Sequence, residues 1–152
     1  MKGANGSLRS CRHNLQYWRG LPYLGFGAGA HGYAGGWRTA DVNPIRDYIQ
    51  RSMHGESQPF PRSPANAFAH AVDHEDEIGE FMMVGLRLTE EGVSERIFND
   101  RFGIGLAEKY AKPIARLTQA GLIAWAGENE DRHLRLTRRG RLLGNQVFVE
   151  FI

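Results

Sequence analysis

The sequence predicts an α+β protein, in which a winged-helix-like domain over residues 73–152 follows a shorter segment with one strand, a glycine-rich loop and one helix. Three observations support this. Glycines gather after a short apolar run near the N-terminus, apolar residues recur at helical spacing from residue 73 onward, and two alternating runs flank a polar turn near residue 130. Because residues 54–66 cannot sustain regular structure, we place a domain boundary there and assign residues 1–65 to the first domain.

The composition is that of an ordinary soluble domain. The 152 residues are 41% hydrophobic and 24% charged, and no apolar run is long enough to cross a membrane. The first seven residues lack the apolar region of a secretory signal, so we expect a cytoplasmic protein. Cys11 is the single cysteine, which excludes an internal disulfide and an all-cysteine metal or cluster site within one chain. The net charge of +2 is too small to indicate nucleic-acid binding by itself.

The N-terminal segment begins with an aromatic and polar run, His13–Trp18, which leads through a turn signal into a short apolar strand, Tyr23–Phe26. The loop Gly27–Gly32 follows. Because glycine has no Cβ, another molecule can approach such a backbone closely, and a bound ligand is one interpretation. A tight passage from strand to loop without a ligand is the other. The glycine spacing fits a dinucleotide-binding fingerprint, but that motif requires a helix at its last glycine, and residues 33–37 indicate more loop.

Helix signals follow the glycine-rich loop. Asn43–Pro44 predicts a helix over about residues 44–53, because Asn can cap a helix and Pro fits its first position. The next helix covers about residues 73–88, and carboxylates in its first turns interact favourably with the positive end of the helix dipole. Its buried stripe consists of Ile78, Phe81, Met82, Gly85, Leu86 and Leu88. Ser94 should cap a further helix that ends at Gly103.

The remaining sequence predicts a helix, a hairpin and a closing helix. A helix covers about residues 105–120, with a kink or restart at Pro113. Two strands, residues 122–125 and 133–136, flank the polar turn, and the last helix runs over about residues 138–151. The apolar positions of the first helix are Leu106, Tyr110, Ile114 and Leu117, and those of the last are Leu142, Leu143, Val147 and Phe151.

Three groupings of reactive side chains have simpler explanations than catalysis or metal binding. His70 and His74 are four residues apart, as metal ligands on a helix can be, but no third ligand accompanies them, so we expect solvated histidines and no zinc. Cys11 and His13 share a face if their segment is a strand, yet no acid orients the histidine. The carboxylates within residues 75–80 suit a helix start.

Basic side chains suggest an alternative function. In a winged helix, the wing can contact DNA, and the neighbouring sequence is rich in arginine. These residues are Arg132, Arg135, Arg138, Arg139 and Arg141. A non-enzymatic nucleic-acid-binding module is therefore the alternative, although arginines spread over a hairpin and a helix start are more often a solvated or domain-facing surface.

Two linked motifs resemble one protein family. His13–Trp18 resembles the HNxxYW motif, and Tyr23–His31 the YLGxGxGAH strand and loop, of the HemN/HemW group of radical S-adenosylmethionine proteins. Residues 77–152 are similar to the C-terminal domain of that group. The group includes oxygen-independent coproporphyrinogen III oxidase and a haem chaperone, both of porphyrin and haem metabolism. The HNxxYW form and the histidine that ends the second motif favour the haem-chaperone branch.

The resemblance implies a larger parent protein. Family members are more than twice this length and bind a [4Fe-4S] cluster through a CxxxCxxC motif, early in a partial β/α barrel, and that motif is absent here. Residues 1–65 then correspond to a remnant of that barrel, consisting of its last strand, loop and helix. We expect the chain to be a C-terminal fragment that is inactive alone, because the cluster supplies the electron that cleaves S-adenosylmethionine. An unpaired barrel strand should be partly disordered, swapped or self-associated.

The resemblance also implies site residues and ligands. Those that would line the edge of the S-adenosylmethionine and substrate site are Leu15, Gln16, Ala30 and His31. His13 is the candidate haem ligand, because an imidazole can ligate iron and the rings of Tyr17 and Trp18 can stack on a tetrapyrrole. The partner would be haem or coproporphyrinogen, and the cofactors of the parent a [4Fe-4S] cluster and S-adenosylmethionine. Local sequence alone also fits a buried pair of His13 and Asn14 that fixes the entry to the strand.

Overall fold

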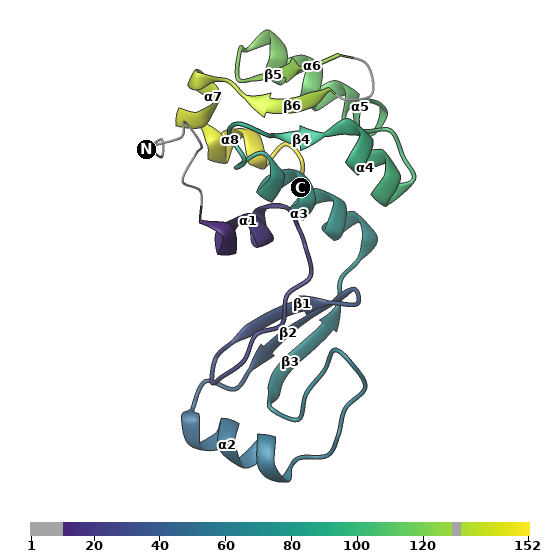
Figure 1. The fold of residues 1–152 in the computed structure, drawn as a ribbon. Coiled ribbons are helices and arrows are strands. Elements are labelled where there is room, and N and C mark those ends of the chain that lie inside the picture. The colour runs from purple at the N-terminus through teal and green to yellow at the C-terminus, as the bar shows by residue number, and fades with distance from the viewer. Residues whose placement is uncertain (1–10, 129–131) are drawn as a thin grey trace. The chain divides into compact units, whose positions relative to one another are not determined.

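The structure, a computed structural model, describes residues 11–128 and 132–152 (Figure 1). It is a mixed α and β protein with two small sheets. The chain divides into two compact units: an N-terminal unit, Met1–Tyr17 with Leu21–His74, and a C-terminal unit, Trp18–Gly20 with Glu75–Ile152. Within the described ranges, no helix combines the length and the apolar character that crossing a membrane requires.

The N-terminal unit contains a three-stranded antiparallel sheet. Its strands, in the order β1-β2-β3, are β1 (His31–Ala34), β2 (Trp37–Asp41) and β3 (Asn66–Ala71). Gly35 and Gly36 form the two-residue turn between β1 and β2, and their φ angles are 55° and 74°. A hairpin turn of this length requires positive φ at both positions, which glycine adopts without strain.

Three sequence predictions for this unit are wrong. The strand predicted over Tyr23–Phe26 is reduced to an isolated bridge between Tyr23 and Tyr33. Residues 33–37, predicted as loop, are the end of β1 and its turn into β2. Asn66, the last residue of the run predicted as irregular, begins β3, a strand that the sequence did not predict and that pairs with β2 across a connection that includes a helix. β3 carries little local signal, because its partner β2 is distant in the sequence and its stability comes from that pairing.

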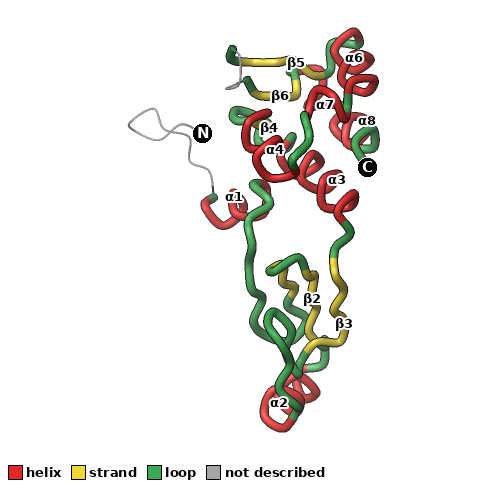
Figure 2. The backbone as a smooth tube through the Cα atoms, turned by 90° about the vertical axis from the view of Figure 1, so that its right-hand side faces the viewer, coloured by secondary structure: helices red, strands yellow, loops and turns green. Residues whose placement is uncertain are grey.

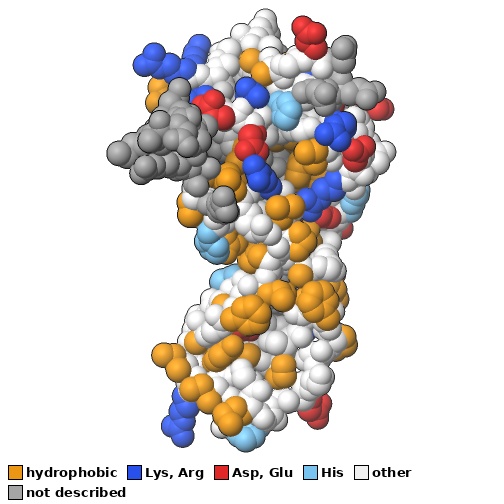
Figure 3. Space-filling model, in the orientation of Figure 1, with side chains coloured by type: hydrophobic (Ala, Val, Ile, Leu, Met, Phe, Trp, Pro, Cys, Tyr) orange, Lys and Arg blue, Asp and Glu red, His pale blue; other side chains and the backbone are white. Residues whose placement is uncertain are grey.

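The helix α2 (Ile45–His54) lies between β2 and β3 in the chain and begins one residue after the predicted start. None of its residues is buried. Ile45, Ile49 and Met53 recur every four residues on one face and are 71%, 51% and 71% exposed. In Figure 2, α2 lies beyond one end of the sheet, and Figure 3 shows hydrophobic side chains gathered on the surface of this unit. The N-terminal unit therefore leaves much of its apolar surface in contact with solvent.

The C-terminal unit combines short helices with a second antiparallel sheet. Its elements are α3 (His74–Gly85), β4 (Val93–Ser94), α4 (Glu95–Phe102), α5 (Leu106–Lys109), α6 (Ala111–Gln119), β5 (Ile123–Ala126), β6 (His133–Leu136), α7 (Arg138–Leu142) and α8 (Gly144–Phe148). The strand order is β4-β6-β5, so the central strand is the last of the three in the chain. The predicted hairpin is confirmed, with β5 displaced by one residue from its predicted bounds.

Both ends of α4 are as predicted. The Ser94 hydroxyl accepts a hydrogen bond from the Ile97 backbone N–H at 3.3 Å, which satisfies one of the free donors at the helix start. Gly103 follows the last turn with φ 69°, the left-handed conformation that ends many helices.

Two other predicted helices are interrupted, the first of them as predicted. The helix over about residues 105–120 restarts after Tyr110 and not at Pro113, which lies in the first turn of α6, where a missing N–H costs no hydrogen bond. The helix predicted over about residues 138–151 breaks at Leu143 into α7 and α8. As a result Leu142, which helical spacing assigned to the apolar face, is 83% exposed.

One hydrophobic core holds the C-terminal unit together. Its buried members come from every helix and strand of the unit except α7, and the largest fully buried side chains are Phe98, Phe151, Ile78, Met82, Leu86, Leu106, Ile123, Leu134, Val93 and Val147. Phe81, Phe98 and Phe102 contact one another with ring centroids 5.0 to 6.2 Å apart. The buried stripe predicted for α3 is confirmed at each of its positions.

Candidate functional site

The helix α1 (Arg12–Trp18) contains the whole first motif, His13–Trp18. His13 and Tyr17 are one turn apart, and their rings meet edge to face with centroids 4.9 Å apart. The His13 ring is exposed, so the interpretation of His13 as a buried structural histidine is wrong. His13 lies in a helix and Cys11 directly precedes it, so the strand geometry proposed for a thiol and imidazole pair is also wrong.

Three tyrosines connect α1 to β1 within the N-terminal unit. The rings of Tyr17 and Tyr23 lie 4.5 Å apart at 71°. Tyr23 and Tyr33 exchange backbone hydrogen bonds of 2.7 and 2.8 Å, which makes them an isolated antiparallel pair. His31 lies two residues before Tyr33, at the exposed start of β1. The aromatic contacts thus hold the exposed face of α1 in a defined relation to the strand that follows the glycine-rich loop.

The glycines of the loop are explained mainly by contacts within the chain. A Cβ on Gly25 would overlap the His31 carbonyl, one on Gly29 would lie 2.5 Å from Asn43 Oδ1, and one on Gly32 would lie 2.7 Å from Thr39 Oγ1. Real Cβ atoms essentially never come this close to another atom. A side chain at these three positions would therefore clash with neighbouring atoms of the same chain, which explains the glycines. Gly27 differs, since it has φ 113° and open space on its Cβ side. The tight-passage interpretation therefore accounts for most of this motif.

A pocket of about 260 Å³ lies beside the loop, within the N-terminal unit. Leu24 and Phe26 line one part of it, and Tyr48 of α2 lines another, where its hydroxyl accepts a hydrogen bond from the Gly27 N–H at 3.1 Å. Phe60 also lines the pocket, and Phe26 and Phe60 are 82% and 73% exposed. The walls are therefore largely apolar and open to solvent.

One buried carboxylate lies in this pocket, and sequence analysis missed it. Asp41 Oδ1 accepts hydrogen bonds from Asn66 Nδ2 at 2.7 Å and from Ser63 Oγ at 3.4 Å. Both donors follow the long connection through α2 and meet Asp41 where the β2 and β3 register shifts. Because that meeting depends on the sheet, no local spacing in the sequence could have indicated it. These two donors hydrogen-bond the Asp41 carboxylate and so connect the end of β2 to the start of β3.

The other predicted site residues fall into separate places. Gln16 Nε2 donates to the Pro22 carbonyl at 2.8 Å, so its amide holds the turn after α1. Ala30 uses its N–H for the Gly27 carbonyl and its carbonyl for the Asp41 N–H, next to His31. Leu15 is half-buried on α1, and Trp18 belongs to the C-terminal unit. The residues from α1 and those at the start of β1 therefore form two sets.

The described residues hold no group of three or more His, Cys, Asp or Glu side chains that could bind a metal ion. His70 lies on β3 and His74 begins α3, so they are not on one helix as their spacing suggested. Cys11 is exposed and is the single cysteine of the sequence. One thiolate does not fit the ligand set of an iron–sulfur cluster, which takes several cysteines.

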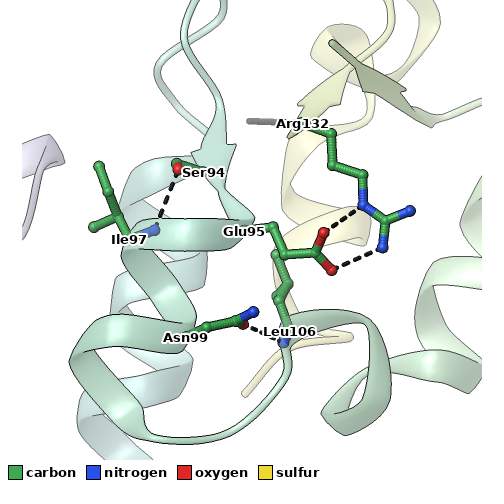
Figure 4. Close-up of polar contacts among 6 residues, drawn as sticks. All are labelled: Ser94, Glu95, Ile97, Asn99, Leu106 and Arg132. Atoms are coloured by element: carbon green, nitrogen blue, oxygen red, sulfur yellow. Dashed lines mark hydrogen bonds and ion pairs between the residues drawn. The ribbon is translucent and has the colours of Figure 1, made fainter. Parts of the chain in front are cut away.

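The arginines of the alternative nucleic-acid interface are largely engaged within the C-terminal unit. Arg132 forms a two-point ion pair with Glu95, which raises the pKa of the guanidinium through hydrogen bonding and charge (Figure 4). Arg135 Nε donates to the Glu91 carbonyl at 3.1 Å, and Arg139 Nη1 donates to the Ala120 carbonyl at 3.4 Å. The ion pair occupies two donor nitrogens of Arg132, whereas Arg135 and Arg139 each use one and keep others.

The sequence is similar to a known domain family and to several known proteins. Residues 72–143 match the model of the HemN C-terminal domain family. The chain is 40% identical over 141 residues to the heme chaperone HemW of Bacillus subtilis (strain 168), covering 93% of this chain and 34% of that protein. It is 28% identical over 141 residues to HemW of Lactococcus lactis subsp. lactis, with the same two coverages.

A solved structure, coproporphyrinogen III oxidase (HemN) from Escherichia coli, described as a radical SAM enzyme, superposes with a TM-score of 0.59 at 19% identity. The superposition covers 86% of this chain and 28% of that one, and at this identity it shows likeness of fold alone. The chain spans about a third of the length of the curated relatives it matches. These comparisons give the nucleic-acid alternative no support.

Proposed function

Because this chain is HemN/HemW-like and carries a HemN C-terminal domain, we propose that it belongs to a haem-handling protein in which His13 ligates the haem iron. The observation that carries the proposal is the exposed His13 ring on α1, held against Tyr17. A neutral imidazole is a common axial ligand of haem iron, and an exposed ring needs no rearrangement to reach one. The curated relatives quoted above are named heme chaperones, which supports this branch over the oxidase branch.

The residues around His13 have supporting roles in this proposal. Tyr17 lies one helical turn after His13 and offers an aromatic face beside a bound ring, and Trp18 follows it in the chain. In the whole protein, Leu15 and Gln16 on α1 would line one side of the S-adenosylmethionine and substrate site, and Ala30 with His31 another. Support for this second assignment is the resemblance of the two motifs.

Radical chemistry is not proposed for this chain alone. The residues present do not fit a [4Fe-4S] cluster, because the sequence has one cysteine. A cluster and S-adenosylmethionine belong to our proposal only as cofactors of the whole protein, as does any action on coproporphyrinogen.

We also propose a fold type for each of the two units. We regard the C-terminal unit as winged-helix-like, and what supports this is its succession of α3, β4, α4 and α6, followed by the hairpin of β5 and β6, with β6 as the central strand. We regard residues 11–65 as part of a wall of a larger barrel, although the sheet to which they contribute is antiparallel and so departs from the parallel strands of a β/α barrel. The exposed apolar stripe of α2 supports this, since such a face suits burial in a larger protein.

The test is a haem titration of the purified chain, followed through the Soret absorption band. For His13→Ala we expect loss of the ligated spectrum and an affinity lower by at least about tenfold, since losing even an outer partner of a metal ligand costs about 10–100-fold. His54→Ala is the matched control, because His54 is also exposed and ends α2. Identical spectra and affinities for the wild-type chain and His13→Ala would exclude His13 as the ligand.

A further inference from the structure

The C-terminal unit contains a second pocket that the proposed function does not use. It has a volume of about 520 Å³, within the usual range for small-molecule sites. Its walls come from the turn after α3, the end of β6, and the junction of α7 with α8. All of its lining residues belong to the C-terminal unit, so the pocket is complete within one compact part of the chain.

Two arginines give this pocket its charge. The guanidinium carbon of Arg87 lies 4.7 Å from the centroid of the Phe148 ring, a cation–π contact that keeps the charge against an aromatic surface. Arg141 Nη2 donates to the Thr89 carbonyl at 3.2 Å, which fixes that side chain at the rim. Figure 3 shows Lys and Arg side chains gathered at the end of the unit where α7 lies.

Neither of these arginines has a carboxylate partner among the described residues, in contrast with others of the same unit. The arginines of the C-terminal unit that form ion pairs with glutamate are Arg19, Arg101, Arg116 and Arg132. The planar guanidinium has five N–H donors, and its fork geometry matches a carboxylate. Arg87 and Arg141 therefore retain donors that a carboxylate on a bound molecule could use.

The rest of the lining is partly apolar and partly polar. Its apolar side chains are Leu136, Leu143, Phe148 and the 83% exposed Leu142, and its polar ones are Thr89, Asn145 and Gln146. The break between α7 and α8 at Leu143 turns Leu142 away from the core. Exposure of such a large aliphatic side chain is unfavourable in water unless something covers it. The pocket thus combines charge that suits an acid with surface that suits an apolar body.

We infer that this pocket binds a carboxylate-bearing apolar ring system, with Arg87 and Arg141 holding the carboxylates and Leu142 covering the ring. The choice of ligand rests on the proposed function, because a porphyrin is an apolar macrocycle with carboxylate side chains. In this arrangement the pocket holds the edge of the porphyrin that carries the carboxylate groups. It is a second contact for the tetrapyrrole, in the C-terminal unit and independent of iron ligation.

Metal-free protoporphyrin tests the inference, because it contains no iron and its binding therefore cannot depend on ligation by an imidazole. Binding to the full chain is followed by porphyrin absorption and fluorescence. We expect Arg87→Gln and Arg141→Gln each to weaken binding about tenfold, as loss of a charged hydrogen bond does. Arg138→Gln is the matched control, because Arg138 is exposed on α7, loses the same charge and does not line the pocket.

The outcomes separate cleanly. Absence of binding, or equal loss in Arg138→Gln and Arg87→Gln, overturns the inference, because the latter result indicates general attraction to a basic surface. Leu142→Asp places a negative charge at an already exposed position, so the circular dichroism spectrum of the unit should not change. Porphyrin binding should weaken, and unchanged binding overturns the inference. The proposed function fails on a different reading, the Soret spectrum of iron haem with His13→Ala, so the two failures are distinguishable.

Discussion

Tyr110 shows how burial and a neighbouring charge act together on one side chain. Its hydroxyl donates to the Phe151 carbonyl at 3.0 Å, and its ring meets the Phe151 ring edge to face at 5.0 Å. Burial, and secondarily the negative charge of Glu75, raise the pKa of Tyr110 to about 12. Both effects disfavour the phenolate, which also could not donate to the Phe151 carbonyl.

The raised pKa predicts a pH dependence of stability. The folded chain holds the Tyr110 proton more tightly than the unfolded chain, in which the pKa is about 10. This contribution to the free energy of unfolding is therefore complete below pH 10 and is lost as the pH rises from about 10 to about 12. Urea unfolding at a series of pH values measures it. Tyr110→Phe should show a shallower loss across that window, and equal slopes for the two proteins would contradict the assignment.

At the scale of the element, α4 is fixed at its start by local and distant contacts. The Ser94 cap is a local feature that the sequence predicts. The ion pair between Glu95 and Arg132 is not, because it joins the first turn of α4 to the residue directly before β6 (Figure 4). The guanidinium also lies 4.3 Å over the Trp125 ring of β5, so this one side chain links a helix and a hairpin.

Removal of Arg132 should therefore cost more than removal of a surface charge. In Arg132→Leu the buried Glu95 carboxylate loses its charged partner, and we expect the free energy of unfolding to fall by about 2 kcal/mol. Arg96→Leu is the control, since Arg96 pairs with Asp100 at 3.9 Å on the exposed side of the same helix, and its loss should cost at most about 0.5 kcal/mol. Chemical denaturation measures both, and similar losses would show that the buried pair contributes no more than the exposed one.

The same contrast explains how much of the fold the sequence predicts. Elements whose partners are near in the chain, such as the α4 caps and the hairpin of β5 and β6, follow from capping residues and alternation. The hairpin at Gly35–Gly36 was missed although its signal is present, because two adjacent glycines between short runs are typical of a two-residue turn. β3 and the Asp41 contacts could not be predicted, since they depend on pairing across α2.

Some features of the candidate site also follow from local sequence, and others do not. The adjacency of His13 and Tyr17 is a consequence of helical spacing once the segment is known to be a helix. The pocket in the C-terminal unit depends on the break at Leu143, and apolar periodicity predicted a continuous helix there. A glycine at the start of α8 and another inside α7, Gly144 and Gly140, were the available signs of that break.

For the whole molecule, the two units differ in how much apolar surface they bury. In the described part of the N-terminal unit, the buried hydrophobic residues are Tyr33, Ala34, Val42 and Ala65. The C-terminal unit has a continuous core of leucine, isoleucine, valine, methionine and aromatic side chains. Since apolar burial is the main favourable contribution to folding, the second unit should be much the more stable.

This difference predicts that the units open separately. Backbone amides in the ladder between β1 and β2 should exchange with solvent through partial unfolding of the N-terminal unit, while those between β5 and β6 require opening of the larger core. Native-state hydrogen exchange, corrected for intrinsic rates, should show protection at least about tenfold lower in the first ladder, equivalent to about 1.4 kcal/mol. Ile49→Lys, which alters an exposed position of α2, should leave protection in the second ladder unchanged. Equal protection of both ladders would mean that the chain unfolds as one cooperative body, and that the small sheet has a stability its buried side chains do not explain.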